Sequence, residues 1–326
     1  MRHWFLAAGL TLAILGGSLG ELAAQAPEGA WPSKPIRVIV PLTAGSASDV
    51  MARIVTEQLA KELGQPVVIE NRPGAGNTIG MAAVAKAEPD GYTLLVNSST
   101  HTVTPATRSN LGFEMADLAA VIPLGNMPVV MIFNPSKGYK KLSDFVTYAK
   151  ANPGKINYAS AGAGNSSHLN GERFRLAAGL EAVHLPFKGA PEATTEVIAG
   201  RADFYFSPLV NALPLIKDGS VQALAVSGSS RASALPDVPT TVEAGFPNSE
   251  YNFWAGMFAP AKTPAAIRDK LFQEMAKALQ APSTHARLVN LGADPMPLTP
   301  AQFEALVKSE IETNTQLVKA AGIKVN

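Results

Sequence analysis

The sequence of 326 residues contains no cysteine. This absence excludes disulfide bonds, a thiol nucleophile, metal sites built from cysteine, and lipid attachment through an N-terminal cysteine. Metal-binding histidine motifs are missing too, because the spacing of the five histidines matches neither H-E-x-x-H nor another metal-ligand pattern. We therefore expect a protein without a metal or other cofactor, whose fold is stabilised by packing alone.

The sequence also lacks an excess of charge of either sign. It has 27 Lys and Arg residues against 26 Asp and Glu residues, and no basic run stands out. This balance argues against nucleic acid or an anionic membrane surface as the partner. Beyond the N-terminus, no apolar run approaches the roughly 20 residues of a membrane-spanning helix. A role in transport therefore requires a separate membrane partner.

The N-terminus has the three parts of a secretory signal peptide. A basic start, Arg2-His3, precedes an uncharged apolar run from Trp4 to Leu19, and small residues follow at Ala23 to Ala26. This arrangement predicts a cleaved signal peptide over residues 1–26 and export to a periplasm-like compartment, with a mature chain that begins near Pro27. The alternative is an N-terminal membrane anchor that is not cleaved.

The mature chain of roughly 300 residues is too long for one hydrophobic core and suits two lobes. Short apolar runs rich in β-branched residues alternate with segments of helical periodicity, which predicts doubly wound α/β lobes. The predicted strands span residues 36–40, 67–69, 92–96, 129–133, 156–159, 181–185, 203–206, 221–226 and 253–259. The predicted helices span residues 48–63, 79–87, 143–151, 168–178, 191–199, 265–279 and 300–321.

Two helix starts carry the same signal, a threonine cap followed by proline at the first helical position. These are Thr263-Pro264 and Thr299-Pro300, and proline in that position is typical of a helix N-terminus.

Two apolar strands are candidates for chain crossings between the lobes, one near residues 129–133 and one near residues 253–259. Two crossings make a hinge that can close on a ligand. We therefore predict one lobe from residues 27–131 and 254–326 and a second lobe from residues 132–253.

Two loops of similar character, one in each predicted lobe, join a strand to a helix. They run from Pro41 to Asp49 and from Ser160 to His168, and both are rich in glycine, hydroxyl and other small residues. At a helix N-terminus, unpaired backbone N–H groups and the helix dipole favour an anion. In open α/β sheets, ligands bind beyond the carboxyl ends of the strands. The pair of loops predicts a cleft for a small carboxylate, whereas either loop alone also fits an ordinary helix cap.

Six blocks of sequence are long and distinctive, and they are Trp31–Arg37, Gly64–Gly76, Pro89–Leu95, Asn152–Lys155, Asn157–Gly162 and Leu235–Thr240. Together they resemble the substrate-binding proteins of tripartite tricarboxylate transporters, often called the Bug family. The similarity covers essentially the whole mature chain. It implies a two-domain periplasmic binding protein of the Venus-flytrap type that is not an enzyme and that delivers small organic acids to membrane permease subunits. We expect it to be a monomer.

In that family, backbone amides, hydroxyls and water from loops of both domains hold the ligand carboxylate. By position, the resemblance places this role on Thr43–Ser48, Ser99–His101 and Ser160–His168. Weaker signals in neighbouring segments add a few polar residues to the set. The candidate ligand-binding residues are Thr43, Ala44, Gly45, Ser46, Ala47, Ser48, Asp49, Asn77, Ser99, Thr100, His101, Ser160, Ala161, Gly162, Asn165, Ser166, Ser167, His168, Lys188 and Ser207.

The sequence departs from the family pattern at two places. The first loop reads Ala44-Gly45-Ser46-Ala47 where relatives usually have proline and several glycines, and Ser207-Pro208 stands where many relatives have Asp-Asn. The second change removes a carboxylate that would pair with an ammonium group. We therefore expect a plain mono- or dicarboxylate ligand, not an acidic amino acid. Phe187, Tyr205 and Phe206 either line a pocket for an aromatic acid or belong to the core.

Other function classes find little support in the sequence. The one G-x-S-x-G match, Gly16 to Gly20, lies inside the predicted signal peptide. A pairing of Ser167 with His101 is compatible with hydrolysis, but the same groups also suit carboxylate binding. The glycines from Gly74 to Gly80 fit the dinucleotide fingerprint poorly, because the third glycine comes one residue late. A periplasmic sensor that presents its bound carboxylate to a signalling receptor is the remaining alternative.

Overall fold

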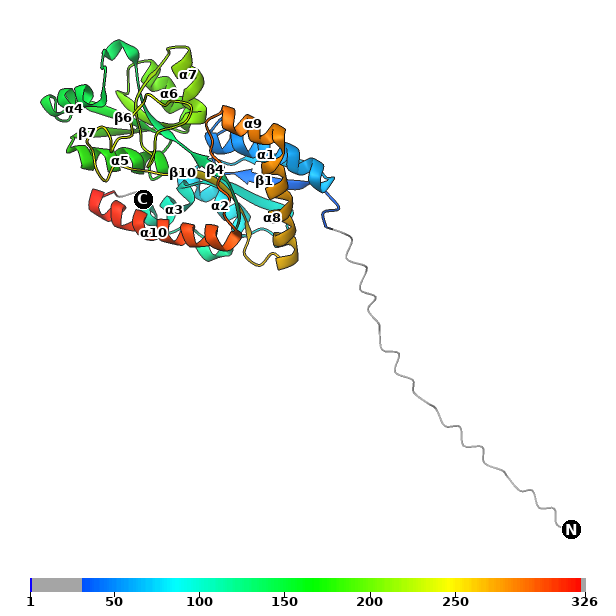
Figure 1. The fold of residues 1–326 in the computed structure, drawn as a ribbon. Helices are drawn as coiled ribbons and strands as arrows, with labels where there is room; N and C mark the ends of the chain where they lie inside the picture. The colour runs from blue at the N-terminus through cyan, green and yellow to red at the C-terminus, as the bar shows by residue number, and fades with distance from the viewer. Residues whose placement is uncertain (2–30, 324–326) are drawn as a thin grey trace. The chain divides into compact units, whose positions relative to one another are not determined.

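The computed structural model describes Met1 and residues 31–323. The predicted signal peptide and its cleavage site lie outside these residues. From Pro32 onward, the chain forms one compact unit that contains two five-stranded sheets (Figure 1). Among the described helices, none combines the length and the apolar character that a membrane span requires.

The first sheet has the strand order β2-β1-β3-β10-β4. β1 (Ile36–Val40) pairs in parallel with β2 (Val67–Asn71) and β3 (Thr93–Ser98), while β10 (Phe253–Pro260) runs antiparallel to both β3 and β4 (Leu118–Met127). We call this sheet and the helices packed on it the first lobe. Its helices are α1 (Ala47–Leu63), α2 (Thr78–Ala85), α3 (Thr100–Thr107), α8 (Ala265–Gln280), α9 (Pro282–Asn290) and α10 (Pro300–Ala321).

The second sheet has the strand order β7-β6-β8-β5-β9. β6 (Ile156–Ser160) pairs in parallel with β7 (Ala182–Pro186) and β8 (Phe204–Pro208), while β5 (Val129–Phe133) runs antiparallel to both β8 and β9 (Gln222–Val226). We call this sheet and its helices the second lobe. Its helices are α4 (Leu142–Ala151), α5 (Ser166–Ala178), α6 (Ala190–Ile198) and α7 (Leu209–Lys217). Short 3-10 turns occur at Ala75–Asn77, Met115–Asp117 and Pro135–Lys137.

The prediction of two α/β lobes is confirmed, but both sheets are mixed and not wholly parallel. The antiparallel strands β10 and β5 are the ones that follow a passage of the chain from one sheet to the other. The chain leaves the first sheet at Pro128, between β4 and β5, and it returns between β9 and β10. A strand that enters a sheet from the other lobe, without a helical crossover from a neighbouring strand, can lie antiparallel to its neighbours.

Helix boundaries follow local sequence signals in most places. α1 starts after Ser46, whose backbone is extended, and ends at Gly64, which adopts a left-handed conformation with φ 65°. α10 begins with a capping box between Thr299 and Gln302, as the Thr-Pro signal predicts. The corresponding prediction for Thr263 is wrong, because Pro264 itself occupies the cap of α8 and no side chain caps this helix.

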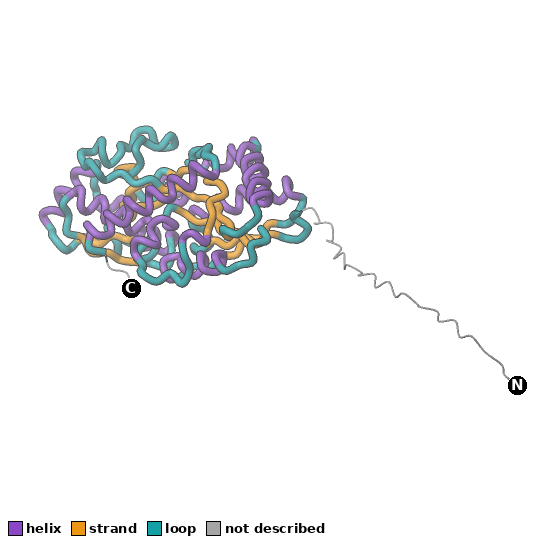
Figure 2. Tube along the Cα trace, turned by 90° about the horizontal axis from the view of Figure 1, so that it is seen from below, coloured by secondary structure: helices purple, strands orange, loops and turns teal. Residues whose placement is uncertain are grey.

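Helices pack around the strands of the two sheets (Figure 2), and each lobe buries an apolar core. In the first lobe, Ile39, Trp254 and Phe303 belong to one buried cluster, and in the second lobe Val130 and Tyr205 belong to another. Four strands end close to the start of a helix. β1 ends at Val40, β3 at Ser98, β6 at Ser160 and β8 at Pro208, and each strand leads within a few residues into a helix.

Candidate ligand-binding site

α1 and α5 each begin after a loop that follows a strand, one in each lobe, but their caps differ. Asn165 caps α5, and its side-chain oxygen accepts hydrogen bonds from the Ser167 hydroxyl (2.9 Å) and the His168 N–H (3.0 Å). Ser46 caps α1 without such a bond, so its hydroxyl is left for another partner. Both helices are long enough to carry an appreciable positive dipole end toward whatever lies in front of them.

A third helix, α3, brings the two lobes into direct contact. The Thr100 hydroxyl donates to the Ser166 hydroxyl at 3.0 Å, and the Ser166 N–H donates back to the Thr100 oxygen at 3.1 Å. A second link joins the Asn211 side-chain N–H to the Gly45 carbonyl at 2.7 Å. These bonds join α3 to α5 and the loop before α1 to α7, and the starts of α1, α3 and α5 line one cavity at the boundary between the lobes.

These helix starts enclose an inner cavity of about 30 Å³. By the usual measure this is room for about two water-sized groups, comparable to the two oxygens of a carboxylate. The polar residues that line it are Ser46, Ser48, Ser98, Thr100, Asn165, Ser166, Ser167, Asn170 and Tyr251. The apolar part of the lining comes from Leu42, Ala47, Val129, Ala161, Ala190, Tyr205, Phe206, Pro208 and Phe253.

Several polar groups of the inner cavity have no partner within the described residues. The hydroxyl oxygens of Ser46 and Ser48 and the side-chain oxygen of Asn170 are buried and unpaired. In the same part of the chain, no group accepts a hydrogen bond from the backbone N–H of Ala47, Ser48 or Ser167. Buried polar groups are normally paired, and leaving one unpaired costs about 1–3 kcal/mol. This concentration of unused donors, beside the unused Asn170 acceptor, therefore indicates a place for a hydrogen-bonding guest.

A larger outer cavity of about 480 Å³ adjoins the inner one, and the two share Leu42, Ala161 and Asn165. Its other lining comes from Pro41, Thr43, the turn Pro73–Asn77, Arg108, Gly162, Ala163, Phe187 and Lys188. Among the described residues, Arg108 and Lys188 are the only charged ones that line it, and no acidic side chain lines either cavity. Burial lowers the pKa of Arg108. The polarity thus changes from neutral donors inside to positive charge outside.

Two stacked histidines support the loop at the start of α5. The rings of His168 and His184 lie 3.7 Å apart and nearly parallel. His184 Nε2 lies 2.6 Å from the Ser160 hydroxyl, and His168 Nδ1 accepts a hydrogen bond from the Gly164 N–H at 3.1 Å. Burial lowers the pKa of His168 to about 4 and that of His184 to about 3. Both rings are therefore neutral near pH 7 and shape the loop without adding charge.

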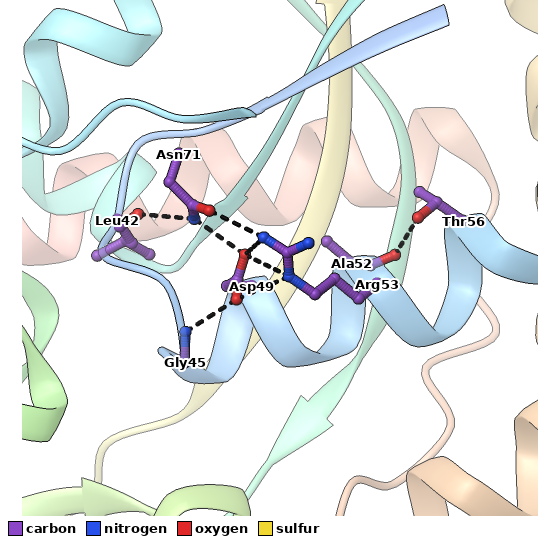
Figure 3. A network of polar contacts seen from close by, with 7 residues as sticks. All are labelled: Leu42, Gly45, Asp49, Ala52, Arg53, Thr56 and Asn71. Atoms are coloured by element: carbon purple, nitrogen blue, oxygen red, sulfur yellow. Dashed lines mark hydrogen bonds and ion pairs between the residues drawn. The ribbon is translucent and has the colours of Figure 1, made fainter. Parts of the chain in front are cut away.

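The loop before α1 is held by Asp49, as Figure 3 shows. The Asp49 carboxylate accepts hydrogen bonds from the Gly45 N–H (2.9 Å) and the Asn71 side chain (2.9 Å), and it forms an ion pair with Arg53 (3.0 Å). Burial works to raise the pKa of Asp49, but the bonds from Arg53, Gly45 and Asn71 outweigh it and lower the pKa. Asn71 also donates to the Leu42 carbonyl at 3.0 Å. Asp49 thus faces its own loop.

The structure brings twelve of the twenty predicted residues to the two cavities. Those at the inner cavity are Ser46, Ala47, Ser48, Thr100, Ala161, Asn165, Ser166 and Ser167. The outer cavity adds Thr43, Asn77, Gly162 and Lys188. The predicted residues that line neither cavity are Ala44, Gly45, Asp49, Ser99, His101, Ser160, His168 and Ser207. Of these, His101 is buried in the first lobe, where its ring stacks on Phe258 at 3.9 Å.

The two cavities are also lined by residues that the sequence analysis did not predict. Of these, Asn170 could have been found from its position in the helix. Asn170 lies four and three residues after Ser166 and Ser167, so helical spacing places it on the same face of α5. No local pattern indicates the other residues. The inner cavity includes Tyr251 and Phe253, and the outer cavity includes Arg108, because distant parts of the chain meet there.

A third cavity, of about 350 Å³, lies between β4, α8 and α9. Its lining is mostly apolar, with residues such as Ile122, Phe272 and Leu288, so it offers few donors for a carboxylate. Within residues 31–323 there is also no cluster of His, Asp and Glu side chains that could hold a metal ion.

The family model that describes the tripartite tricarboxylate transporter family receptor matches residues 51–323 of the chain. The protein belongs to this family. Its members are substrate-binding proteins, so the protein is a solute-binding protein and not an enzyme.

Solved structures agree with this assignment across nearly the full length of the chain. Rpa4515 of R. palustris with adipate is 30% identical and superposes with a TM-score of 0.87, covering 90% of this chain and 99% of that one. MatC from Rhodopseudomonas palustris with bound malate is 34% identical with a TM-score of 0.84, covering 88% and 100%. The periplasmic binding protein BugD is 32% identical with a TM-score of 0.86, covering 90% and 99%. The family thus comprises periplasmic binding proteins of this fold.

Proposed function

We propose that this receptor-family protein binds a small mono- or dicarboxylate without an amino group, in the periplasm, and delivers it to the membrane subunits of a tripartite transporter. The observation that carries the proposal is the inner cavity. There, unpaired hydroxyl and amide donors from opposed helix starts surround a space that has the size of a carboxylate group.

The donors of this cavity suit an anion better than a neutral guest. Hydrogen bonds to an ionised acceptor are roughly twice as strong as neutral ones, and two helix N-termini add their dipoles. The outer cavity leaves room for the rest of the ligand beside Arg108 and Lys188. Relatives of the same fold hold adipate and malate, which are both dicarboxylates.

The absence of acidic side chains from both cavity linings argues against an amino acid ligand. A buried ammonium group without a carboxylate partner is strongly unfavourable. Ser207, which takes the place of a family carboxylate, turns its hydroxyl to the Pro208 carbonyl at 3.3 Å. A plain carboxylate avoids this cost, and the rings of Tyr205 and Phe206 also allow an aromatic acid.

Calorimetry with succinate, malate, adipate, terephthalate and glutamate tests the ligand class. We expect at least one of the first four acids to bind with a Kd in the micromolar range or below, and glutamate to bind at least tenfold more weakly. Preferential binding of glutamate would refute the prediction of a ligand without an amino group. No binding of any acid would refute the proposal as a whole.

Uptake measurements test the transport role. In cells that lack the gene, uptake of the radiolabelled acid identified by calorimetry should fall and should recover on complementation. Unchanged uptake, together with a lost transcriptional response to the same acid, would indicate a sensor in place of a transporter component.

A further inference from the structure

Glu310 is a carboxyl group on the inner side of α10 that the proposed binding mechanism does not use. It is partly buried, and its carboxyl oxygens receive the Trp254 indole N–H at 3.1 and 3.0 Å. The Thr102 hydroxyl lies 3.1 Å from Oε2. In the described part of the chain, no cation pairs with Glu310 or donates a hydrogen bond to it.

The two partners of Glu310 are the residues that hold Ser99 in place. The Ser99 N–H donates to the Trp254 carbonyl at 2.9 Å, and the Ser99 carbonyl accepts from the Thr102 N–H at 3.0 Å and the Thr102 hydroxyl at 2.8 Å. Ser99 caps α3, and the next residue, Thr100, makes the contact with Ser166 across the two lobes. Glu310 therefore fixes the helix start that closes one side of the inner cavity.

The Thr102 hydroxyl makes different hydrogen bonds in the two protonation states of Glu310. The Thr102 hydroxyl has a single proton but lies within hydrogen-bonding distance of two acceptors, Ser99 O at 2.8 Å and Glu310 Oε2 at 3.1 Å. It also accepts from the Asn314 side chain at 2.9 Å. If Glu310 is protonated, its O–H donates to Thr102, Thr102 donates to Ser99, and every group in the network is paired. If Glu310 is ionised, Thr102 must turn its proton toward Glu310, and the Ser99 carbonyl keeps only the bond from the Thr102 N–H.

The surroundings of Glu310 also favour the protonated form. Burial raises its pKa to about 7, because the bonds from Trp254 and Thr102 do not compensate for lost hydration. Among the neighbouring groups, His101 of α3 is neutral, since burial lowers its pKa to about 3. Burial and the charge of Glu310 raise the pKa of Tyr251, while Arg173 of α5 acts in the opposite direction on that tyrosine. Along α10, Lys308 pairs with Glu304, and Glu312 is exposed.

We propose that Glu310 is a positioning residue for the ligand cavity, that it acts in its protonated form through Thr102 and Trp254, and that carboxylate binding is consequently linked to proton uptake. The inference rests on the proposed carboxylate-binding function and adds its regulation by pH. Loss of the Glu310 proton loosens the first turn of α3 and with it the Thr100 contact to Ser166.

Calorimetry with adipate, malate and succinate between pH 5.5 and 8.5 tests this inference in the wild type, Glu310→Gln, Glu310→Leu and Glu312→Gln. We expect the wild-type Kd to be level below pH 6.5 and to rise about tenfold by pH 8.5. Glu310→Gln, whose amide keeps the donor to Thr102, should bind within about threefold of the wild type at pH 6 and show no pH dependence. Glu310→Leu should bind at least tenfold more weakly at every pH.

Glu312→Gln is the matched control, because the same change is made at an exposed glutamate of the same helix, and it should keep the wild-type pH profile. Titrations in two buffers of different ionisation enthalpy should show proton uptake on binding near pH 7.5 for the wild type and none for Glu310→Gln. A level wild-type profile, or a profile that Glu310→Gln retains, would overturn the inference while leaving the proposed function intact. No binding of the three acids at pH 6 would overturn the proposed function, and this inference with it.

Discussion

Single residues set the polarity of the ligand site. The inner cavity presents serine and threonine hydroxyls, two asparagine side chains and backbone N–H groups, while the charged residues Arg108 and Lys188 are confined to the outer cavity. In the proposed mode of binding, the donors to the first carboxylate are consequently neutral and belong to the loops at the helix starts. Charge enters only where the far end of a longer ligand would lie.

This division predicts a role for Arg108 in selectivity. Arg108→Gln should weaken binding of adipate about three- to tenfold, because a partly desolvated cation interacts more strongly with a second carboxylate than an exposed one does. Calorimetry with hexanoate, which has the same length and one carboxylate, supplies the comparison. Equal losses for adipate and hexanoate would contradict the assignment. Lys188→Gln, at an exposed position, should change either affinity by less than about twofold.

The stacked histidines predict a loss of stability in acid. The pKa values of His168 and His184 lie near 4 and 3 in the folded protein, below the ordinary 6.5. The unfolded chain therefore binds more protons as the pH falls below 6.5, and the folded state loses up to about 1.4 kcal/mol per pH unit and per histidine. Urea unfolding between pH 7 and pH 4.5 should show this decline. In His184→Gln the slope should be smaller, and an unchanged slope would contradict the assignment.

At the scale of secondary structure, most helices and strands could be predicted from sequence. The spacing of apolar residues and the capping residues indicate the same elements. α3 could not be predicted, since its sequence from Thr100 to Thr107 is rich in β-branched residues and contains Pro105. The helix forms because it packs against α10, and this packing outweighs the weak helix propensity of the segment. β4 and α7 were obscured in the same way by the prolines at 123 and 214.

The candidate site was predictable where a local sequence pattern marks it, and not where distant segments meet. The loops at Ser46–Ser48 and Asn165–Ser167 were predictable from glycine and hydroxyl content before a helix. The positions of Arg108 and Tyr251 depend on which distant segments meet, and no local pattern reports this. His101 and Ser160 illustrate a second limit, because a polar residue in a binding loop can face its own lobe. The lobe boundaries near residues 131 and 253 stay a prediction, although the sheets separate at Pro128 and before β10.

The start of α5 offers a test of binding by distributed donors. Ser166→Pro removes the N–H that donates to Thr100 and the hydroxyl that accepts from it. Proline is tolerated at the first helical position, so the fold should persist while carboxylate affinity falls about tenfold or more. Ser46→Pro at the cap of α1 should act similarly, because it removes an unpaired hydroxyl. Lys188→Ala should have a far smaller effect, and comparable losses from all three would count against this mode of binding.

At the scale of the whole molecule, the close approach of the two lobes depends on Gly189. Its backbone is extended, with φ −178°, and an added methyl group would overlap the Thr43 hydroxyl of the other lobe. Gly189→Ala should therefore hold the lobes apart and weaken carboxylate binding by at least tenfold, with little change in the melting temperature of the ligand-free protein. Small-angle scattering should show a larger radius of gyration in the presence of ligand than for the wild type.

Two further variants make the Gly189 experiment decisive. Gly189→Ala combined with Thr43→Ala should recover much of the lost affinity, because the overlapping hydroxyl is gone. Gly228→Ala is the control for adding a methyl to this lobe, since its nearest neighbour, the Ser230 carbonyl oxygen, lies 3.4 Å from the new atom. Wild-type affinity in Gly189→Ala would show that binding tolerates a wider separation of the lobes.

The uncharged lining of the inner cavity has a consequence for the medium in which the protein works. At 0.1 M salt, dissolved ions largely screen the attraction between exposed charges that lie more than about 10 Å apart. They hardly affect short hydrogen bonds from buried neutral donors. A monocarboxylate that occupies only this cavity should therefore bind almost equally well in dilute and in saline surroundings. In the proposed periplasmic setting, a receptor that binds through hydroxyls and amides would keep its affinity when the salinity outside the cell changes.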